Sequence, residues 1–259
     1  MEDCVMILNY KVNRVNMDQT IGLMESFIAS GEFHYIVVSN LYCFVESRHS
    51  PEFLKIANSS DLTVADGMSL VYTSRLLGEP IRGRVSGWDL FELFSQIAAQ
   101  KGYTYFLVGG GPDGSERVAE ALVTKYPALK ILGTYSPDLG PINDAENDKI
   151  VSLVNEASPD ILWVGLGGPL QEKWIWRNRS RLNARVALGV GAAFDDQMGR
   201  EKRAPDWMRD HMMDGLYRIT QNPSLLWRKR YDRWFISGVL PILYDVIRRR
   251  VSGLESLKF

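Results

Sequence analysis

The residues best suited to chemistry lie in the segment 161–205, where polar side chains follow two short apolar runs. The runs 161–165 and 186–190 have the composition of buried parallel strands, and glycines follow each of them. Gln171 and Asp195 come soon after these runs. Because the carboxyl ends of parallel strands carry ligand-binding loops, the segment predicts a binding or catalytic site at one edge of a sheet.

An aspartate occupies a comparable place earlier in the chain. Asp66 follows the apolar run 62–64 and precedes Gly67, so a loop between a strand and a helix would expose its carboxylate. Such a carboxylate suits a general base, because an alcohol is a poor nucleophile until its proton is removed. An aspartate before a glycine also commonly caps the following helix, and the residues alone favour that simpler role.

The dipeptide Ser39-Asn40 ends another apolar run, 35–39, and is expected at the same edge of the sheet. A hydroxyl and an amide in this place suit contact with a sugar or a phosphate. They suit a turn that ends the strand equally well, so the residues leave both roles open.

The glycine-rich stretch 109–114 follows an expected strand, precedes an expected helix and satisfies G-x-G-x-x-G through Gly109, Gly111 and Gly114. Glycines in this place let a diphosphate approach the N–H groups of a helix N-terminus. A nicotinamide enzyme also needs an acidic residue after the next strand, whereas the run 130–134 leads into hydroxyl residues. We therefore favour nucleotide-diphosphate binding or a structural turn over NAD binding.

The sequence predicts no metal site and no other cofactor. A D-x-D pair can hold a divalent cation that neutralises a diphosphate, but no two aspartates here are separated by one residue. The adjacent pair Asp195-Asp196 is a poor substitute. The three histidines are scattered. We expect helix N-termini and arginines to meet the charge of a bound diphosphate, with Arg84, Arg218 and Arg228 as candidates.

The elements that must position these residues alternate between strand and helix patterns, which predicts an α/β fold with a doubly wound, mainly parallel, Rossmann-like sheet. Strands are expected at residues 35–39, 62–64, 103–108, 130–134, 161–165 and 186–190. Helices are expected at residues 17–30, 68–77, 88–100, 115–126, 144–157 and 171–182.

Charge divides the chain near residues 199–205, where the patterns also become purely helical. Residues 1–199 carry a net charge of −7 and residues 200–259 one of +6, which predicts an α/β catalytic core with a basic helical appendage and an anionic partner. Two cysteines without metal spacing favour a reducing compartment. No signal-peptide or membrane-spanning pattern occurs, so we expect a cytoplasmic protein.

The appendage has the composition of a membrane-interface segment. Between Trp227 and Ile247, aromatic and aliphatic residues alternate with arginines, and the triplet Arg248-Arg249-Arg250 follows. Aromatic rings suit the headgroup region, and basic residues are attracted to an anionic membrane surface. A helix packed on the core or a contact between copies in a homo-oligomer would show the same pattern, whereas nucleic acid is not expected because no reading motif is present.

Several short motifs together resemble the WecG/TagA/CpsF glycosyltransferase family over about residues 36–235. They are Asp66-Gly67, Arg84-Val85-Ser86-Gly87, the run from Gly167 to Glu172 (GGPLQE), the run from Gly189 to Asp195 (GVGAAFD) and Arg203-Ala204-Pro205. The chain departs from the family pattern in having Ser39 where threonine is usual. In the appendage, Asp214-Gly215 replaces a Glu-Trp pair, Asn222 replaces an acid, and Leu225 replaces a common arginine.

The resemblance implies an inverting transferase that moves a hexose from a UDP-sugar donor to a polyprenyl-diphosphate-linked acceptor in surface-polysaccharide assembly, at the inner face of the cell membrane. It makes Asp66 the catalytic base, with Ser39 and Asn40 beside it. It assigns contact with the nucleotide-sugar to Arg84, Gln171, Asp195, Arg218 and Arg228. UDP-glucose, UDP-N-acetylmannosamine and its uronic acid are all donors in the family, and the residues do not distinguish them. The rival interpretations are an NAD-linked oxidoreductase that uses the 109–114 loop and a non-catalytic membrane-docking module.

Overall fold

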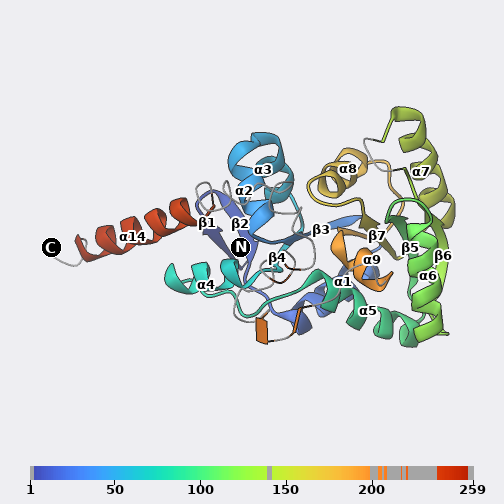
Figure 1. The fold of residues 1–259 in the computed structure, drawn as a ribbon, viewed down its shortest axis with the longest axis horizontal. Helices are drawn as coiled ribbons and strands as arrows, with labels where there is room; N and C mark the ends of the chain where they lie inside the picture. Colours follow the sequence, from blue (N-terminus) through green and yellow to red (C-terminus); the bar gives the residue numbers. More distant parts are fainter. Residues whose placement is uncertain are drawn as a thin grey trace.

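The computed structural model describes residues 3–138, 142–198, 204–205, 207–208, 217, 220 and 238–255. Within these residues, a six-stranded parallel sheet with the strand order β4-β3-β8-β7-β5-β6 forms the centre of the molecule (Figure 1). Its strands are β3 (His34–Ser39), β4 (Leu62–Ala65), β5 (Thr104–Gly109), β6 (Lys130–Tyr135), β7 (Ile161–Gly165) and β8 (Val186–Gly189). The expected doubly wound, parallel α/β fold is confirmed.

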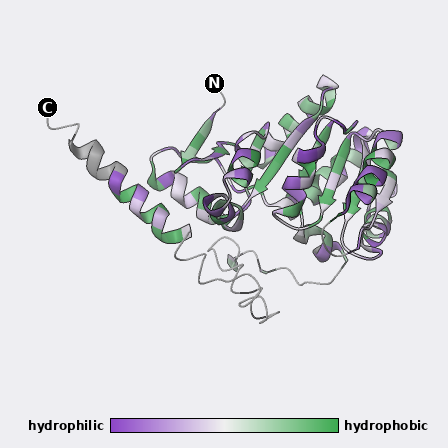
Figure 2. Ribbon diagram, turned by 90° about the horizontal axis from the view of Figure 1, so that it is seen from above, coloured by the Kyte–Doolittle hydropathy of each residue, from purple (hydrophilic) through white to green (hydrophobic). Residues whose placement is uncertain are grey.

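Helices cover both faces of this sheet, because successive residues of each buried strand point to opposite faces. Trp163 and Leu188 pack against one helix layer, whereas Leu162 and Ala187 pack against the other. The first layer holds α1 (Met17–Ser30), α5 (Gly87–Lys101), α6 (Gly114–Lys125) and α9 (Ala192–Gln197). The second holds α3 (Pro51–Asn58), α7 (Asp144–Ala157) and α8 (Leu170–Asn178). In Figure 2 the strands are largely green, whereas the helices show both colours, as amphipathic helices do.

An antiparallel hairpin, which the sequence patterns did not predict, covers the open edge of β4. It consists of β1 (Cys4–Ile7) and β2 (Tyr10–Asn13). The Asn13 Oδ1 atom accepts the backbone N–H of Thr63 at 2.8 Å, so a side chain satisfies an edge donor that no further strand of the sheet reaches. Two four-residue strands are too short to give a clear alternating pattern, which explains the omission.

Two further helices lie near the site, and only one of them was predicted. α2 (Leu41–His49) begins directly after β3, and α4 (Met68–Leu76) follows β4. The second of these was expected, but α2, α3 and α9 were not. α2 buries residues on several sides, Cys43, Phe44, Val45 and Ser47, so it lacks the one-sided apolar stripe that marks a surface helix.

The last described helix, α14 (Leu240–Glu255), lies at the end of the molecule that carries the hairpin and projects away from it (Figure 1). Ile242 and Val246 are buried in the cluster formed with the hairpin and α4, whereas Tyr244 and Ile247 are exposed. In the described part of the chain, no helix is long and apolar enough to cross a membrane. The expected boundary at residues 199–205 falls mostly outside the described residues, so the division into 1–199 and 200–259 stays a prediction.

Candidate active site

Asp66 and the dipeptide Ser39-Asn40 lie side by side at the carboxyl ends of β4 and β3. The two strands are parallel neighbours in which Ser39 is in register with Ala65. The backbone N–H of Asp66 donates to the Ser39 carbonyl at 2.7 Å, which extends the pairing by one residue beyond the strand. The structure thus brings together two of the sequence-predicted site segments.

The Asp66 carboxylate faces the N-terminus of α5. Its Oδ1 atom accepts the N–H of Gly87, the first residue of that helix, at 3.2 Å. The Val85 N–H donates to the Ala65 carbonyl at 2.8 Å, so the loop before α5 runs across the end of β4. Capping of the following helix is not what Asp66 does, because Gly67 is the N-cap of α4 and no side chain bonds there. A helix N-terminus instead favours negative charge on a half-buried carboxylate.

Arg84 stands on the same loop and forms an ion pair with Asp89 in the first turn of α5. Its Nη2 atom lies 3.2 Å from Asp89 Oδ2, and the two side chains are 17% and 27% exposed. A guanidinium has five N–H donors, so this one contact leaves donors for an anionic group. The Asp66-Gly67 and Arg84-to-Gly87 motifs therefore form one surface around the end of β4.

Ser39 and Asn40 differ in what their side chains can reach. The Ser39 side chain is fully buried, and its hydroxyl shares a 2.8 Å hydrogen bond with the Tyr10 hydroxyl from the hairpin. Asn40 caps α2, because its Oδ1 atom accepts the N–H groups of Tyr42 at 2.9 Å and Cys43 at 3.3 Å. Its Nδ2 group has no acceptor among the described residues and is the donor that this turn can offer to a ligand.

The Cys43 thiol lies in the same turn but is unsuited to nucleophilic chemistry. It is 4% exposed, and burial raises the pKa of the Cys43 thiol, with the nearby Glu172 acting in the same direction. A thiolate is the reactive form, so this cysteine is held in its inert state.

Gln171 joins α8 to the turn that follows β8. Its Oε1 atom accepts the Gly191 N–H at 3.1 Å, and its Nε2 group donates to Glu172 Oε1 at 2.8 Å. The residue is 6% exposed. A Cβ on Gly189 would lie 2.5 Å from the Gln171 side chain, so the glycine is required by this packing. Contact between Gln171 and a nucleotide stays a prediction, and in this structure both ends of the amide bind protein groups.

The glycine-rich loop lies where helices leave the sheet for opposite faces, the place where open α/β sheets bind ligands. Gly109 pairs with Gly165 of β7, and a Cβ on Gly109 would come 2.4 Å from the Gly165 carbonyl carbon. At the start of α6, the Ser115 N–H donates to Ser136 Oγ at 2.8 Å. That hydroxyl bonds in turn to Glu116, 2.5 Å away.

These contacts occupy part of the helix terminus that a diphosphate would use. Burial opposes ionisation of Glu116, yet hydrogen bonds from Ser136, from its own backbone N–H and from Thr134 hold the pKa of Glu116 below its usual range. The negative charge favoured at this helix N-terminus is thus supplied by the protein. Close packing accounts for Gly109, and diphosphate binding by Gly109 and Gly111 stays a prediction.

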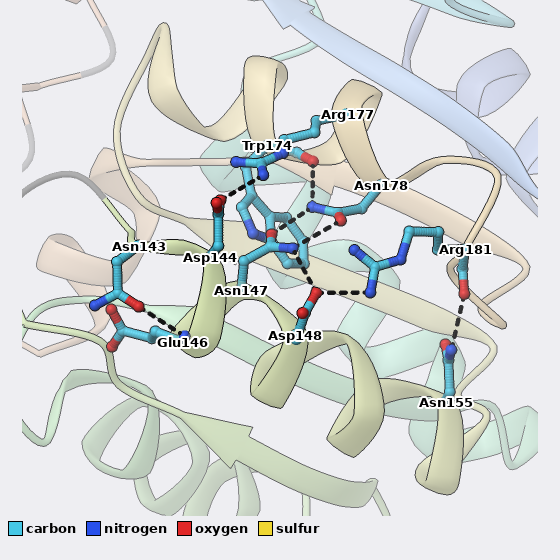
Figure 3. A network of polar contacts seen from close by, with 10 residues as sticks. All are labelled: Asn143, Asp144, Glu146, Asn147, Asp148, Asn155, Trp174, Arg177, Asn178 and Arg181. Atoms are coloured by element: carbon cyan, nitrogen blue, oxygen red, sulfur yellow. Dashed lines mark hydrogen bonds and ion pairs between the residues drawn. The ribbon is translucent and has the colours of Figure 1, made fainter.

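A buried amide pair fixes α8, which carries Gln171, to α7 (Figure 3). Asn178 Nδ2 donates to Asn147 Oδ1 at 2.8 Å, and Asn147 Nδ2 donates back to Asn178 Oδ1 at 3.2 Å. Ion pairs of Arg177 with Asp144 and of Arg181 with Asp148, each 2.7 Å long, flank this pair (Figure 3). Reciprocal amide bonds satisfy both buried side chains, so the register between the two helices is specific.

Asp195 lies half-buried on α9, which packs against the first layer of helices. The ring of Phe194 lies so close to Gly165 that a Cβ there would come within 2.5 Å of it. Gln197 Nε2 donates to Glu92 of α5 at 3.1 Å. Arg218 and Arg228 lie outside the described residues. Among the residues that are described, no three His, Cys, Asp or Glu side chains come together as a metal-binding group.

Sequence reasoning missed two features of this edge. Tyr10, which holds the Ser39 hydroxyl, comes from the unpredicted hairpin, and no motif marks it. Glu172 ends one of the family motifs without a role of its own in the sequence analysis, but it is 1% exposed and accepts a hydrogen bond from Gln171. The sequence signal that could have predicted its burial is its position on the buried face of the helix, next to a glycine-rich loop.

Comparison of the sequence with known proteins identifies the family to which the chain belongs. The sequence model described as "Glycosyl transferase WecG/TagA/CpsF family" matches residues 5–255.

Three similar proteins carry the name N-acetylglucosaminyldiphosphoundecaprenol N-acetyl-beta-D-mannosaminyltransferase. The Bacillus subtilis (strain 168) protein is 32% identical over 216 residues, which is 79% of this chain and 80% of that protein. The Bacillus spizizenii protein is 29% identical over 207 residues, 80% and 78% of the two chains. The Staphylococcus aureus (strain MRSA252) protein is 28% identical over 214 residues, 82% of each chain. The chain therefore belongs to the WecG/TagA/CpsF family of glycosyl transferases.

Proposed function

We propose that the protein is an inverting glycosyltransferase that moves a hexose from a UDP-sugar to a polyprenyl-diphosphate-linked saccharide in surface-polysaccharide biosynthesis. Membership of a glycosyl transferase family supports the reaction class. The relatives are named for transferring N-acetylmannosamine to an N-acetylglucosaminyl-diphosphoundecaprenol, which supports a lipid-linked acceptor and makes N-acetylmannosamine the first donor to test. The family gives no support to the NAD-linked oxidoreductase considered for the glycine-rich loop.

The observation that carries this proposal is the place of Asp66. Its half-buried carboxylate lies at the end of β4, is held by the Gly87 N–H, and has Asn40 and Arg84 on neighbouring loops. In the proposed reaction Asp66 removes the proton from the acceptor hydroxyl as that oxygen attacks C1 of the donor sugar, and the UDP diphosphate leaves from the opposite face. Inversion at C1 follows from this single displacement.

The other side chains of the edge divide into ligand contacts and supports. We assign Arg84 to the leaving diphosphate and the Asn40 amide to a sugar hydroxyl, while the buried Ser39 hydroxyl supports the strand end on which Asn40 stands. Gln171 and Asp195 complete the nucleotide-sugar site from α8 and α9. Arg218 and Arg228 add charge from the basic segment, which is also the part proposed to bind an anionic membrane surface at the inner face of the membrane.

Product formation with defined substrates tests the proposal. The purified protein is incubated with UDP-N-acetylmannosamine, UDP-glucose or the uronic-acid donor, together with a short-chain lipid diphosphate N-acetylglucosamine acceptor. We expect one donor to give a disaccharide-lipid product and free UDP. The same donor should raise the melting temperature, since a ligand at a hundredfold excess over Kd stabilises a fold by about 2.7 kcal/mol. Stabilisation by NAD, with no product from any donor, would contradict the assignment.

A further inference from the structure

Glu172 is the most isolated buried acid in the described part of the chain. Its side chain is 1% exposed, and it forms no ion pair with a described residue. The Oε1 atom accepts a hydrogen bond from Gln171, but Oε2 is buried without a hydrogen-bond partner among the described residues. Leaving a buried carboxylate unpaired is costly, so a purely structural residue here would more simply be apolar.

Among the described residues, the titratable groups that face Glu172 carry no positive charge. The titratable side chains close enough to interact with it are Tyr10 from β2, Tyr35 from β3, and Tyr42 and Cys43 from α2. Gly168 approaches from the loop before α8, where a Cβ would lie 3.5 Å from Oε2. Burial raises the pKa of the Glu172 carboxyl, and its hydrogen bond with Gln171 opposes that rise only in part. Burial therefore disfavours the charged form of Glu172 relative to that of an exposed glutamate.

Glu172 determines which way the neighbouring amide points. The Gly191 N–H can only donate, so it requires the oxygen of Gln171 at 3.1 Å, and the Gln171 Nε2 group is then directed to Glu172 Oε1 at 2.8 Å. Without an acceptor at position 172, a 6% exposed amide would keep a buried N–H group unpaired or would turn over and lose Gly191. The chain of contacts therefore runs from Glu172 through Gln171 to the turn between β8 and α9.

We propose that Glu172 is a positioning residue for sugar transfer: it orients the Gln171 amide, which holds the Gly189-to-Gly191 turn where Asp195 on α9 can meet the nucleotide-sugar. The inference rests on the proposed function, because it assigns Glu172 to the same site. Glu172 does not touch the reacting atoms. Its effect on transfer passes entirely through Gln171, and this is what distinguishes it from a residue that only stabilises α8.

The test compares Glu172→Met, which removes the acceptor, with Glu172→Gln, which keeps an oxygen for the Gln171 amide. Transfer is measured as kcat/KM, and hydrogen exchange of the Gly191 amide is measured by NMR. We expect Glu172→Met to lower kcat/KM by about tenfold to a hundredfold and to speed exchange at Gly191. Glu172→Gln should retain activity within about threefold. In a Gln171→Met background, Glu172→Met should add less than about a threefold further loss, because the two act as one unit.

Asn178→Leu is the matched control, since it removes another fully buried polar side chain from the same helix without contacting the Gly191 turn. An equal loss of kcat/KM in this variant, or unchanged Gly191 exchange in Glu172→Met, would overturn the proposal. Independent, multiplying losses in the double variant would overturn it as well. If Glu172→Met does not fold, the test uses Glu172→Gln alone. A loss of more than about tenfold in the kcat/KM of Glu172→Gln would then overturn the proposal. If the wild-type protein transfers no sugar, the proposed function is refuted but the positioning role of Glu172 is not. Hydrogen exchange of the Gly191 amide still tests the contacts from Glu172 through Gln171 to Gly191.

Discussion

Replacing Asp66 by asparagine should separate catalysis from binding. The change removes the proton acceptor but keeps an oxygen that can accept the Gly87 N–H, now at 3.2 Å from the carboxylate. General-base catalysis contributes about 10²- to 10⁴-fold, which is roughly 3–5 kcal/mol of transition-state stabilisation. We expect Asp66→Asn to lose that factor in kcat while the donor binds with nearly unchanged affinity.

Stability should change far less than activity. The lost charge at the N-terminus of α5 costs about 0.3–1 kcal/mol. For a protein of this size that corresponds to a fall of about 1–4 °C in melting temperature. Asp66→Ala also removes the acceptor for Gly87, and the comparable loss of a helix cap costs about 0.5–2 kcal/mol. The asparagine variant should therefore melt above the alanine variant, although both transfer sugar poorly.

The assay follows UDP release and lipid-linked product, with donor binding measured by calorimetry on the same preparations. Asp144→Asn is the control, since this aspartate has an 88% exposed side chain and forms a surface ion pair with Arg177. Turnover of Asp66→Asn within about threefold of wild type would refute the base assignment. Equal loss of donor binding and of turnover would show instead that Asp66 is a binding residue.

Three further outcomes follow from particular contacts. Gly109→Ala should cost about 3 kcal/mol or more in unfolding free energy, because a Cβ would lie 2.4 Å from the Gly165 carbonyl carbon. Gly167 also has a positive φ but has open space around it, so Gly167→Ala should cost only about 1 kcal/mol in the same denaturant titration. Burial opposes ionisation of Glu92, but hydrogen bonds led by that from Lys125 hold the pKa of Glu92 below its usual range. Its stabilisation is therefore present above about pH 4.3 and lost as the pH falls through the folded-state pKa, and Glu92→Gln should flatten the acid limb of a stability–pH curve. Transfer should survive EDTA because the sequence has no D-x-D pair, and activity lost on chelation and restored by magnesium or manganese would contradict this.

The sheet and most of its helices follow from the sequence because their patterns are strong and local. β7 is an uninterrupted apolar run, and α1 begins at Asn16 with a reciprocal capping box and ends at a glycine in the left-handed conformation. The hairpin and α2 lack such signals. The hairpin is defined by a long-range contact, that of Asn13 with Thr63, and α2 by burial on several sides. Such tertiary information is not present in a window of neighbouring residues.

The location of the candidate site could be predicted from the sequence, but the roles of its side chains could be predicted only in part. Parallel strands bring their carboxyl ends to one edge, so the positions of Asp66 and Asn40 follow from the strand assignments. Whether a polar side chain points outward or into the protein depends on neighbours from distant segments. Ser39 turns to Tyr10, and Gln171 bonds to Gly191. Neither contact is visible from the residue types in the motif.

The family motifs therefore mix two kinds of residue, and substitution at each kind should have a different consequence. Gly165 and Gly189 are required because Phe194 and Gln171 occupy the space that a side chain would need, so their loss damages the edge itself. Asp66 and Arg84 are half-buried on loops, and the hydrogen bond from the Val85 N–H to the Ala65 carbonyl uses neither of their side chains. It follows that a relative with all its glycines but without the aspartate should still fold and bind a nucleotide-sugar, yet fail to transfer it. Loss of donor binding in such a relative would show that the aspartate helps to build the site, and glycines and aspartate would then not have separate roles.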